Sequence, residues 1–203
     1  MDPEIHETTE IVKLMFEAAM LKRTERTGYA FLGTGRENSA AHSFSTAFIA
    51  LLLGKMVPEA DSRKLVFMAL IHDLPEARTG DANAVHKKYI RRDEMRAFMH
   101  AVEGCSLADD LMDLYREYHE GQSLEARLAR DADQIDMLVS LKEQMDCGNP
   151  NAERWIPHVE KRLMTPEAKR LAQGIRQVHW AAWWMDSFNE ESAEGKRRNG
   201  NEK

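Results

Sequence analysis

Apolar residues recur at helical spacing along almost the whole chain, and this periodicity limits the fold more than any other feature. In segment 5–21, one face of a helix would carry Ile11, Leu14, Met15, Ala18 and Leu21. No segment shows a convincing alternation of apolar and polar residues, which is typical of a half-buried strand. The pattern predicts further helices over residues 39–53, 61–78, 86–103, 107–119, 123–146 and 166–188. We therefore expect a single all-α domain.

Helix-stop signals separate these segments. Three glycines predict a loop over residues 28–36, and either Asn38 or Ser39 is placed to cap the next helix. The run Gly148-Asn149-Pro150 is a strong stop signal. We expect a domain over residues 1–188, with its motifs in 21–146, C-terminal helices in 151–188 and a disordered polar tail over 189–203.

Composition excludes several classes of partner. The net charge is −6, so no general basic field attracts nucleic acid polymers or an acidic membrane. The one cationic cluster (Lys87, Lys88, Arg91 and Arg92) is read as a solvated helix face, with phosphate contact by one member as the alternative. The longest apolar run, 47–53, is too short to span a bilayer.

The two cysteines, Cys105 and Cys147, lie far apart in the sequence. Their spacing supports neither a thiolate zinc site nor a disulfide framework. Together with the acidic N-terminus, which no secretory apolar core follows, this predicts a cytoplasmic protein.

The dipeptide His72-Asp73 follows an apolar stretch, 64–71, that should be buried. Two adjacent ionisable groups are costly in such a place unless something compensates them, and a metal ion is the usual compensation. His42 upstream and the run Asp131-Ala132-Asp133 downstream complete a His, His-Asp, Asp set. Such mixed nitrogen and oxygen ligands suit a divalent first-row metal.

Two further carboxylates accompany the pair. Glu76 comes four residues after His72, so a continuous helix would place both on one face about one turn apart. A carboxylate there could act as an acid or base in hydrolysis. Asp81 follows Gly80 at the end of this segment, where a short side chain can turn back toward the site, although a lone Asp is more often a turn residue.

Helical periodicity leaves the last ligand open. On a helical wheel Asp131 lies in the centre of the apolar arc, Asp133 at its edge and Asp136 on the polar side. Periodicity alone favours Asp131, but a helix buried on two sides has no single core face.

With these residues in place, the chain resembles the HD-domain metal-dependent phosphohydrolases, and among them the 5′-deoxynucleotidase-like branch. The likeness covers about residues 21–143 and rests on four stretches: Leu21 to Tyr29 with Arg26-Thr27-Gly28-Tyr29, Glu37 to Ser43, Ile71 to Asp81, and Asp131 to Met137. Two departures are Tyr29, where Trp is commoner, and Ala82-Asn83-Ala84 in place of a Pro-containing stretch. They leave the base and sugar preference open.

The resemblance implies a site. It assigns one divalent ion (Mn, Co, Fe, Ni, Zn or Mg) to His42, His72, Asp73 and Asp133, and so prefers Asp133 to Asp131. It also implies that Arg26 binds the substrate phosphate. Glu76 and Asp81 would be the catalytic carboxylates, in an order that the sequence does not fix.

The expected function is hydrolysis of (deoxy)nucleoside 5′-monophosphates. The alternatives are hydrolysis of another phosphate ester, such as a cyclic nucleotide or an alarmone, and a catalytically silent module that binds a nucleotide. A homodimer is expected from the resemblance. The cluster Trp180, Trp183 and Trp184 could form a dimer surface, but core packing is the better expectation for large aromatic residues.

Overall fold

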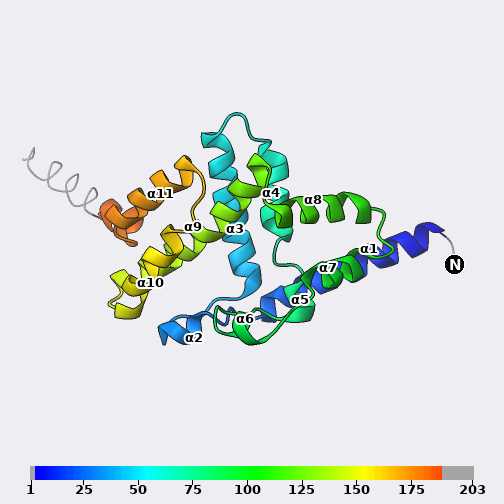
Figure 1. The fold of residues 1–203 in the computed structure, drawn as a ribbon, viewed down its shortest axis with the longest axis horizontal. Coiled ribbons are helices and arrows are strands. Elements are labelled where there is room, and N and C mark those ends of the chain that lie inside the picture. The colour runs from blue at the N-terminus through cyan, green and yellow to red at the C-terminus, as the bar shows by residue number, and fades with distance from the viewer. Residues whose placement is uncertain (1–2, 189–203) are drawn as a thin grey trace, which may run out of the picture.

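The computed structural model describes residues 3–188, and helices joined by short loops make up this range (Figure 1). The longer helices are α1 (Pro3–Met20), α3 (Ser39–Met56), α4 (Ser62–Ile71), α7 (Glu94–Val102), α8 (Ala108–Glu120), α9 (Leu124–Asp146), α10 (Pro150–Glu160) and α11 (Pro166–Gln177). Shorter turns are the 3-10 helix Leu21–Arg23, α2 (Tyr29–Leu32), α5 (Glu76–Thr79) and α6 (His86–Tyr89). The described residues form no strand beyond one isolated bridge, so the predicted all-α fold is confirmed.

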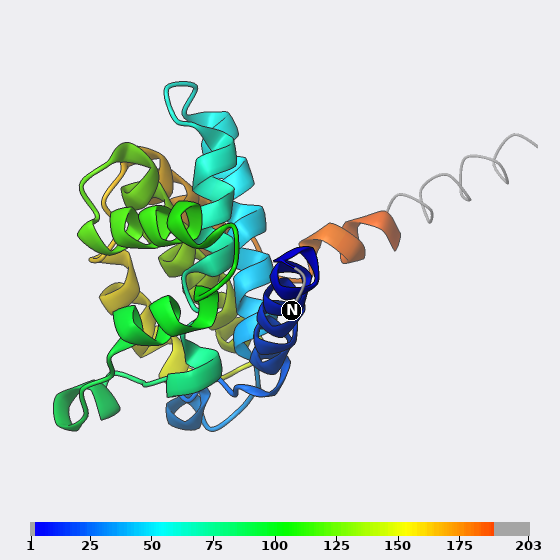
Figure 2. The same cartoon turned by 90° about the vertical axis from the view of Figure 1, so that its right-hand side faces the viewer.

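Helices α3 and α9 form the centre of the fold. They pack against each other and against α4, and α9 also contacts α8, α10 and α11. Figure 1 and Figure 2 show α1, α5 and α7 grouped on one side of this centre. Leu53, Leu65, Met68 and Leu128 are fully buried between the central helices. The helices that build the core therefore also carry His42 and Asp133.

Side-chain caps fix where several helices start. The Asn38 side chain accepts a hydrogen bond from the Ala41 amide at 2.9 Å, so Asn38 rather than Ser39 caps α3. Asn149, within the predicted stop signal, caps α10 in the same way. The first turn of α3 holds His42, so this cap helps to set the position of that ring.

The predicted helix over 61–78 is interrupted. Helix α4 ends at Ile71, residues 72–75 form a turn, and Glu76 begins α5. The amide of Leu74 bonds to the Ile71 carbonyl three residues back, at 3.0 Å. Pro75 has no N–H with which to continue the α-helical pattern. His72 and Asp73 consequently lie on a tight turn.

The predicted helix over 86–103 is also divided. Helix α6 ends at Tyr89, Ile90 is extended, and Asp93 caps α7 by accepting a hydrogen bond from the Arg96 amide at 3.0 Å. An Asp side chain that can bond to a nearby backbone amide favours a new helix start over a continuous helix. The cationic cluster is therefore split between α6 and a loop.

At the C-terminal end, α11 stops at Gln177 instead of running to 188, because Val178 is extended. The Trp180 amide donates to Asp146 Oδ2 at 2.9 Å, and a further helical segment covers 182–188. Trp180 is 38% exposed and Trp183 is 81% exposed, so the expectation that these aromatics pack in the core is wrong for both. The predicted tail, 189–203, lies outside the described residues.

Between residues 3 and 188, no helix combines the length and the apolar composition needed to cross a membrane. Cys105 is buried and Cys147 is exposed, and both are free thiols.

Candidate metal centre and active site

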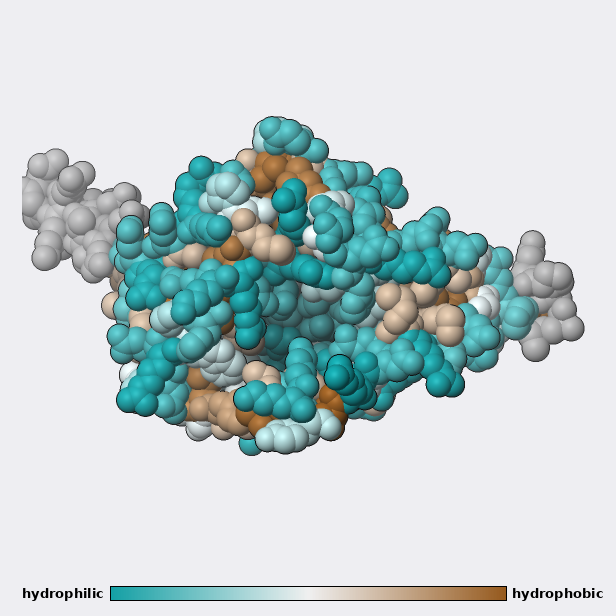
Figure 3. Space-filling view, in the orientation of Figure 1, coloured by the Kyte–Doolittle hydropathy of each residue, from teal (hydrophilic) through white to brown (hydrophobic). Residues whose placement is uncertain are grey.

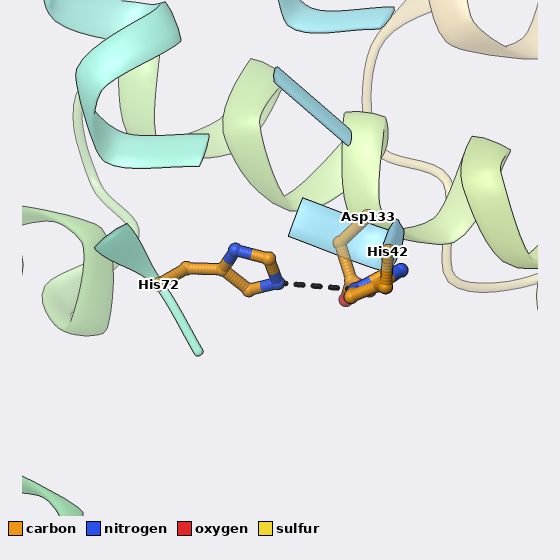
Figure 4. A group of neighbouring side chains, drawn as sticks. All are labelled: His42, His72 and Asp133. Carbon is orange, nitrogen blue, oxygen red and sulfur yellow. Dashed lines mark hydrogen bonds and ion pairs between the residues drawn. The ribbon is translucent and has the colours of Figure 1, made fainter. Parts of the chain in front are cut away.

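Three segments bring two histidines and an aspartate together (Figure 4). His42 comes from the first turn of α3, His72 from the turn after α4, and Asp133 from α9. Their ligand atoms all lie within 4.8 Å of one another. The His42 ring is fully buried and His72 is 7% exposed. The sequence places these groups far apart, and the packing of α3, α4 and α9 makes them one cluster.

The outer nitrogen of each ring has an acceptor. His42 Nδ1 lies 2.6 Å from Asp136 Oδ2, and His72 Nδ1 lies 2.7 Å from the Ala69 carbonyl oxygen. A carboxylate or a carbonyl can only accept, so each neutral ring donates through Nδ1 and leaves Nε2 with a free lone pair. This arrangement is common for metal-binding histidines, because the outer hydrogen bond fixes the tautomer and the orientation of the ring.

With both rings neutral, the four inner atoms of the cluster are all acceptors. His42 Nε2 lies 3.2 Å from His72 Nε2 and 3.2 Å from Asp133 Oδ1. Asp73 Oδ2 lies 3.3 Å from His72 Nε2 and 3.4 Å from His42 Nε2. Such acceptors repel one another unless a proton or a metal cation lies among them. Two imidazole nitrogens and two carboxylate oxygens fit a divalent ion, so the residues present suit such a metal.

The ionisation of the cluster points in the same direction. Burial lowers the pKa of His42, but hydrogen bonds to Asp133 and Asp136 outweigh it and raise that pKa to about 10. Burial raises the pKa of Asp133, yet contact with His42 brings it down to about 2. The pKa of Asp73 is lowered by the two histidines and by Arg26 in spite of its burial. The cluster thus favours a positive charge at its centre: the raised pKa of His42 places a proton there, and a bound metal would supply the charge in its place.

Asp131, which helical periodicity favours as the last ligand, does not lie in the cluster. It is fully buried, and its carboxylate accepts hydrogen bonds from the Met164 amide at 2.7 Å and the Thr165 amide at 2.8 Å. The Thr165 hydroxyl also donates to it at 2.6 Å. Asp131 therefore fastens the start of α11 to α9, and Asp133 is the residue that the fold brings to His42.

Asp136 was missed as a site residue. Its predicted position on the polar side of α9 is wrong, since it is 3% exposed and bonds to His42. The available signal was its place three residues after Asp133, which puts both carboxylates on neighbouring positions of one helix face.

Arg26 lies beside the cluster. Its Nη1 donates to Asp73 Oδ2 at 3.2 Å, and its Nε lies 3.5 Å from Glu37 Oε2. The segment before α2 is held against the start of α3 by the bridge between Glu25 and Asn38 and by the bond from the Arg26 amide to the Glu37 carbonyl. Burial lowers the pKa of Arg26, but Asp73 and the other nearby carboxylates raise it above its ordinary value, so the guanidinium stays charged.

Glu76 is 6% exposed and lines the same cavity. The expectation that Glu76 and His72 share one helix face is wrong, because the chain turns between α4 and α5. Its Oε2 accepts a hydrogen bond from the Ser39 hydroxyl at 2.7 Å, and its Oε1 lies 3.6 Å from Arg92 Nη1. Burial, followed by the charge of Asp73, raises the pKa of Glu76 to about 7.

Asp81 lies on the wall of the cavity next to the segment that carries Arg26. Its Oδ2 accepts hydrogen bonds from the Thr27 amide at 2.5 Å and the Thr27 hydroxyl at 2.8 Å. The Asn83 amide donates to the same hydroxyl at 3.0 Å, and Asn83 Oδ1 accepts from the amides of Val85 and His86. The unusual stretch 82–84 is thus a fixed part of the wall.

One cavity of about 510 Å³ connects these groups. Figure 3 shows the hydrophilic hollow at the centre of one face where it opens. Of the cationic cluster, Lys87 and Arg92 line it. The Arg92 side chain is only 10% exposed and bonds to Glu94 and the Gly80 carbonyl, so reading it as part of a solvated helix face is wrong.

Comparisons with known proteins identify the family of this chain. A family model described as HD domain matches residues 18–176. The 5′-deoxynucleotidase HDDC2 of Danio rerio is 25% identical over 176 residues, which cover 82% of this chain and 86% of that protein. A conserved hypothetical protein from Pyrococcus furiosus has a TM-score of 0.69 and 29% identity, covering 82% of this chain and 99% of that one.

A cyanophage S-2L HD phosphohydrolase, DatZ, whose structure holds dA and one catalytic Zn²⁺ ion, shares the fold at 18% identity and a TM-score of 0.52. That match covers 80% of this chain and 96% of the cyanophage chain. The resemblance drawn from the sequence motifs is confirmed. Because the family model spans most of its length, this protein belongs to the HD domain family.

Proposed function

We propose that this protein is a metal-dependent phosphohydrolase that releases phosphate from (deoxy)nucleoside 5′-monophosphates. The observation that carries the proposal is the set of nitrogen and oxygen ligand atoms that converge beside the cavity lined by Arg26 and Glu76. The names of the 5′-deoxynucleotidase relatives support a nucleotide substrate.

His42, His72, Asp73 and Asp133 would hold one divalent ion, and this ligand set is compatible with Mn, Co, Fe, Ni, Zn and Mg. When bound, such an ion supplies Lewis acidity toward the phosphate and lowers the pKa of a nearby water. Asp136 and the Ala69 carbonyl keep the two rings in the tautomer that this requires.

Arg26 would bind the non-bridging oxygens of the phosphate. A planar guanidinium suits this anion, and it offsets negative charge as the phosphoryl group is transferred. Asp73 and Glu37 hold the side chain at the cavity wall, which reduces the ordering cost when substrate binds.

Glu76 would take a proton from the attacking water as the water oxygen bonds to phosphorus and the ester bond breaks. A pKa of about 7 leaves a large share of its side chains ionised at neutral pH, and the acquired proton is then available for the leaving oxygen. Asp81 is our candidate for positioning the sugar or protonating the leaving oxygen, because it anchors the Thr27 segment beside the phosphate site.

A homodimer and a cytoplasmic location are further parts of the proposal. Phe44, Phe48, Leu51 and Leu52 lie on one side of α3 and are 40% to 72% exposed, which leaves an apolar face that a second copy could cover. Two free thiols are compatible with a reducing compartment. Light scattering on wild type and on Phe44→Glu, Phe48→Glu protein tests the dimer, since the variant should be monomeric.

The test of the activity is phosphate release from a panel of ribo- and deoxyribonucleoside 5′-monophosphates by metal-stripped protein, with Mn²⁺, Co²⁺ or Mg²⁺ added back. Metal-dependent release that is lost in Glu76→Ala is the expected result. No release with any metal would overturn the proposal and direct attention to cyclic nucleotides, alarmones and a binding role.

A further inference from the structure

The cavity continues from the metal centre toward α2 and α10, and this end is apolar. We call it the aromatic chamber; its wall consists of Tyr29, Leu32, Met137, Leu141 and Trp155. All five belong to or pack against the core cluster between α9, α10 and α11. The side chains of Tyr29, Met137 and Trp155 are only half-buried, and each keeps surface on the cavity. An open apolar pocket beside a polar site is suited to a flat apolar ligand group.

The rest of the cavity wall carries charged and polar side chains, among them Lys87, Arg92, Glu94, His119 and Arg130. An aromatic ring placed there would remove water from several charges without replacing it, which is unfavourable. A substrate with an anionic group and an aromatic group therefore has one favourable orientation, with the ring in the aromatic chamber.

Helix α9 joins the two functional regions. Asp133, Met137 and Leu141 are spaced four residues apart and follow one side of the helix. At 1.5 Å per residue, Leu141 lies about 12 Å along the axis from Asp133. A phosphate at Asp133 and Arg26 would leave the sugar beside Met137 and the base at the level of Leu141, which is itself fully buried.

The absence of a side chain at Gly28 lets Trp155 lie close to the segment that carries Arg26. A Cβ at Gly28 would lie 3.4 Å from Trp155 Cη2, so the indole packs directly against the chain two residues after Arg26. Of the other polar side chains that line the cavity, the Ser140 hydroxyl bonds to Tyr29, and Arg162 donates to Gln134 Oε1 at 3.4 Å. The chamber therefore offers ring faces and methylene groups rather than a hydrogen-bonding pattern for one particular base.

We propose that the aromatic chamber binds the nucleobase of the substrate and that Trp155 determines the preference for nucleotides over simple sugar phosphates. This inference rests on the proposed nucleotidase activity. Stacking on an aromatic face is tolerant of base identity, so purine and pyrimidine monophosphates should both be accepted.

The experiment compares dAMP with 2-deoxyribose 5-phosphate, which keeps the phosphate and the sugar but has no base. Wild type should have the higher kcat/KM on dAMP. Trp155→Ala should lose about 5- to 100-fold of kcat/KM on dAMP, as expected for the loss of one stacking contact, and should be unchanged on the sugar phosphate. Trp183→Ala, which removes an exposed tryptophan, is the matched control and should alter neither substrate.

The sugar phosphate also reports on folding, because an unfolded variant loses both activities. If Trp155→Ala is unstable, Trp155→Leu keeps most of the apolar volume without the ring and should show the same selective loss. Equal kcat/KM for the two substrates in wild type, or an equal fall for both in a folded Trp155 variant, overturns the inference while leaving the phosphohydrolase intact. No release from either substrate by wild type would instead contradict the proposed function.

Discussion

His42 Nε2 and His72 Nε2 lie 3.2 Å apart although neither nitrogen carries a proton in the neutral ring that its Nδ1 partner selects. When both rings are neutral, the two lone pairs repel each other at this distance, and Asp73 and Asp133 add negative charge that a proton on His42 offsets in part. The surrounding helices nonetheless bury the pair in a fixed geometry. A bound cation would turn this repulsion into attraction, so metal binding and stability should be coupled.

Removal of the metal is expected to lower thermal stability. An ion present at about 100 times its dissociation constant stabilises by about 2.7 kcal/mol, which for a chain of this size corresponds to a midpoint about 5–10 °C higher. The measurement is a thermal melt of chelator-stripped protein with and without Mn²⁺, together with metal analysis. His72→Ala should lose both the shift and the bound ion.

His158→Ala is the control for this experiment, because His158 is exposed on α10 and is not a member of the metal cluster. It should behave as wild type. A stripped protein whose melting point does not respond to any divalent ion would rule out the coupling between the two histidines and a metal.

Asp131 and Asp133 are expected to respond in opposite ways to the same substitution. Asp131→Asn places an amide group against the Met164 and Thr165 amides, and the lost bonds should cost about 2–4 kcal/mol of unfolding free energy. Metal content should remain. Asp133→Asn should lose metal affinity and activity with a smaller change in stability measured without metal. Denaturant unfolding and metal analysis of both variants are decisive, and a reversed pattern would make Asp131 the ligand.

The sequence allowed the fold class to be predicted because apolar spacing extends over most of the long helices. The helix interruptions were missed for local reasons. Helix α4 ends at Ile71, four residues before Pro75, which cannot continue the helical hydrogen bonds. The Asp93 cap starts α7 inside a segment whose apolar spacing continues across the break. Periodicity records which face is buried, and it is insensitive to a change of helix direction that preserves burial.

The site was predictable to the extent that motifs identify residue types. His42, His72, Asp73 and Asp133 are brought together, and Asp131 is separated from them by a contact with Thr165 that no pattern in α9 encodes. Asp136 and Arg92 were missed as members of the site because both look like solvent-facing charges in sequence. Their roles depend on neighbours from α3 and α5, which only tertiary packing supplies.

Glu76→Gln is expected to lower kcat by about 10²- to 10⁴-fold while metal content stays at the wild-type level, because the amide cannot accept a proton. The pH profile gives an independent check. Burial and Asp73 raise the pKa of Glu76 to about 7, so the ionised base is lost as the pH falls through 7, and wild-type kcat should decline about tenfold per unit below that point. An acid limb that persists in Glu76→Gln would assign it to another group.

Arg92 is expected to position Glu76 and to favour its ionised form. The Arg92 guanidinium lies 3.6 Å from Glu76 Oε1 and is held in the cavity wall by Glu94 and the Gly80 carbonyl. Removing this cation in Arg92→Met should raise the pKa of Glu76 and shift the acid limb of the kcat profile to higher pH. The measurement is kcat and KM for a nucleoside monophosphate between pH 5 and about 9.

A role in phosphate binding would give a different result, since loss of a substrate contact raises KM without moving the acid limb of kcat. Arg92→Lys should restore part of the wild-type profile, because it returns the charge without the guanidinium fork. Arg78→Met is the matched control. Arg78 pairs with Glu17 on the surface, and its loss should leave the acid limb of the kcat profile in place. An acid limb that stays fixed in Arg92→Met would show that the short distance between Arg92 and Glu76 does not set the ionisation of the base, and the pKa of Glu76 would then depend on its burial and on Asp73.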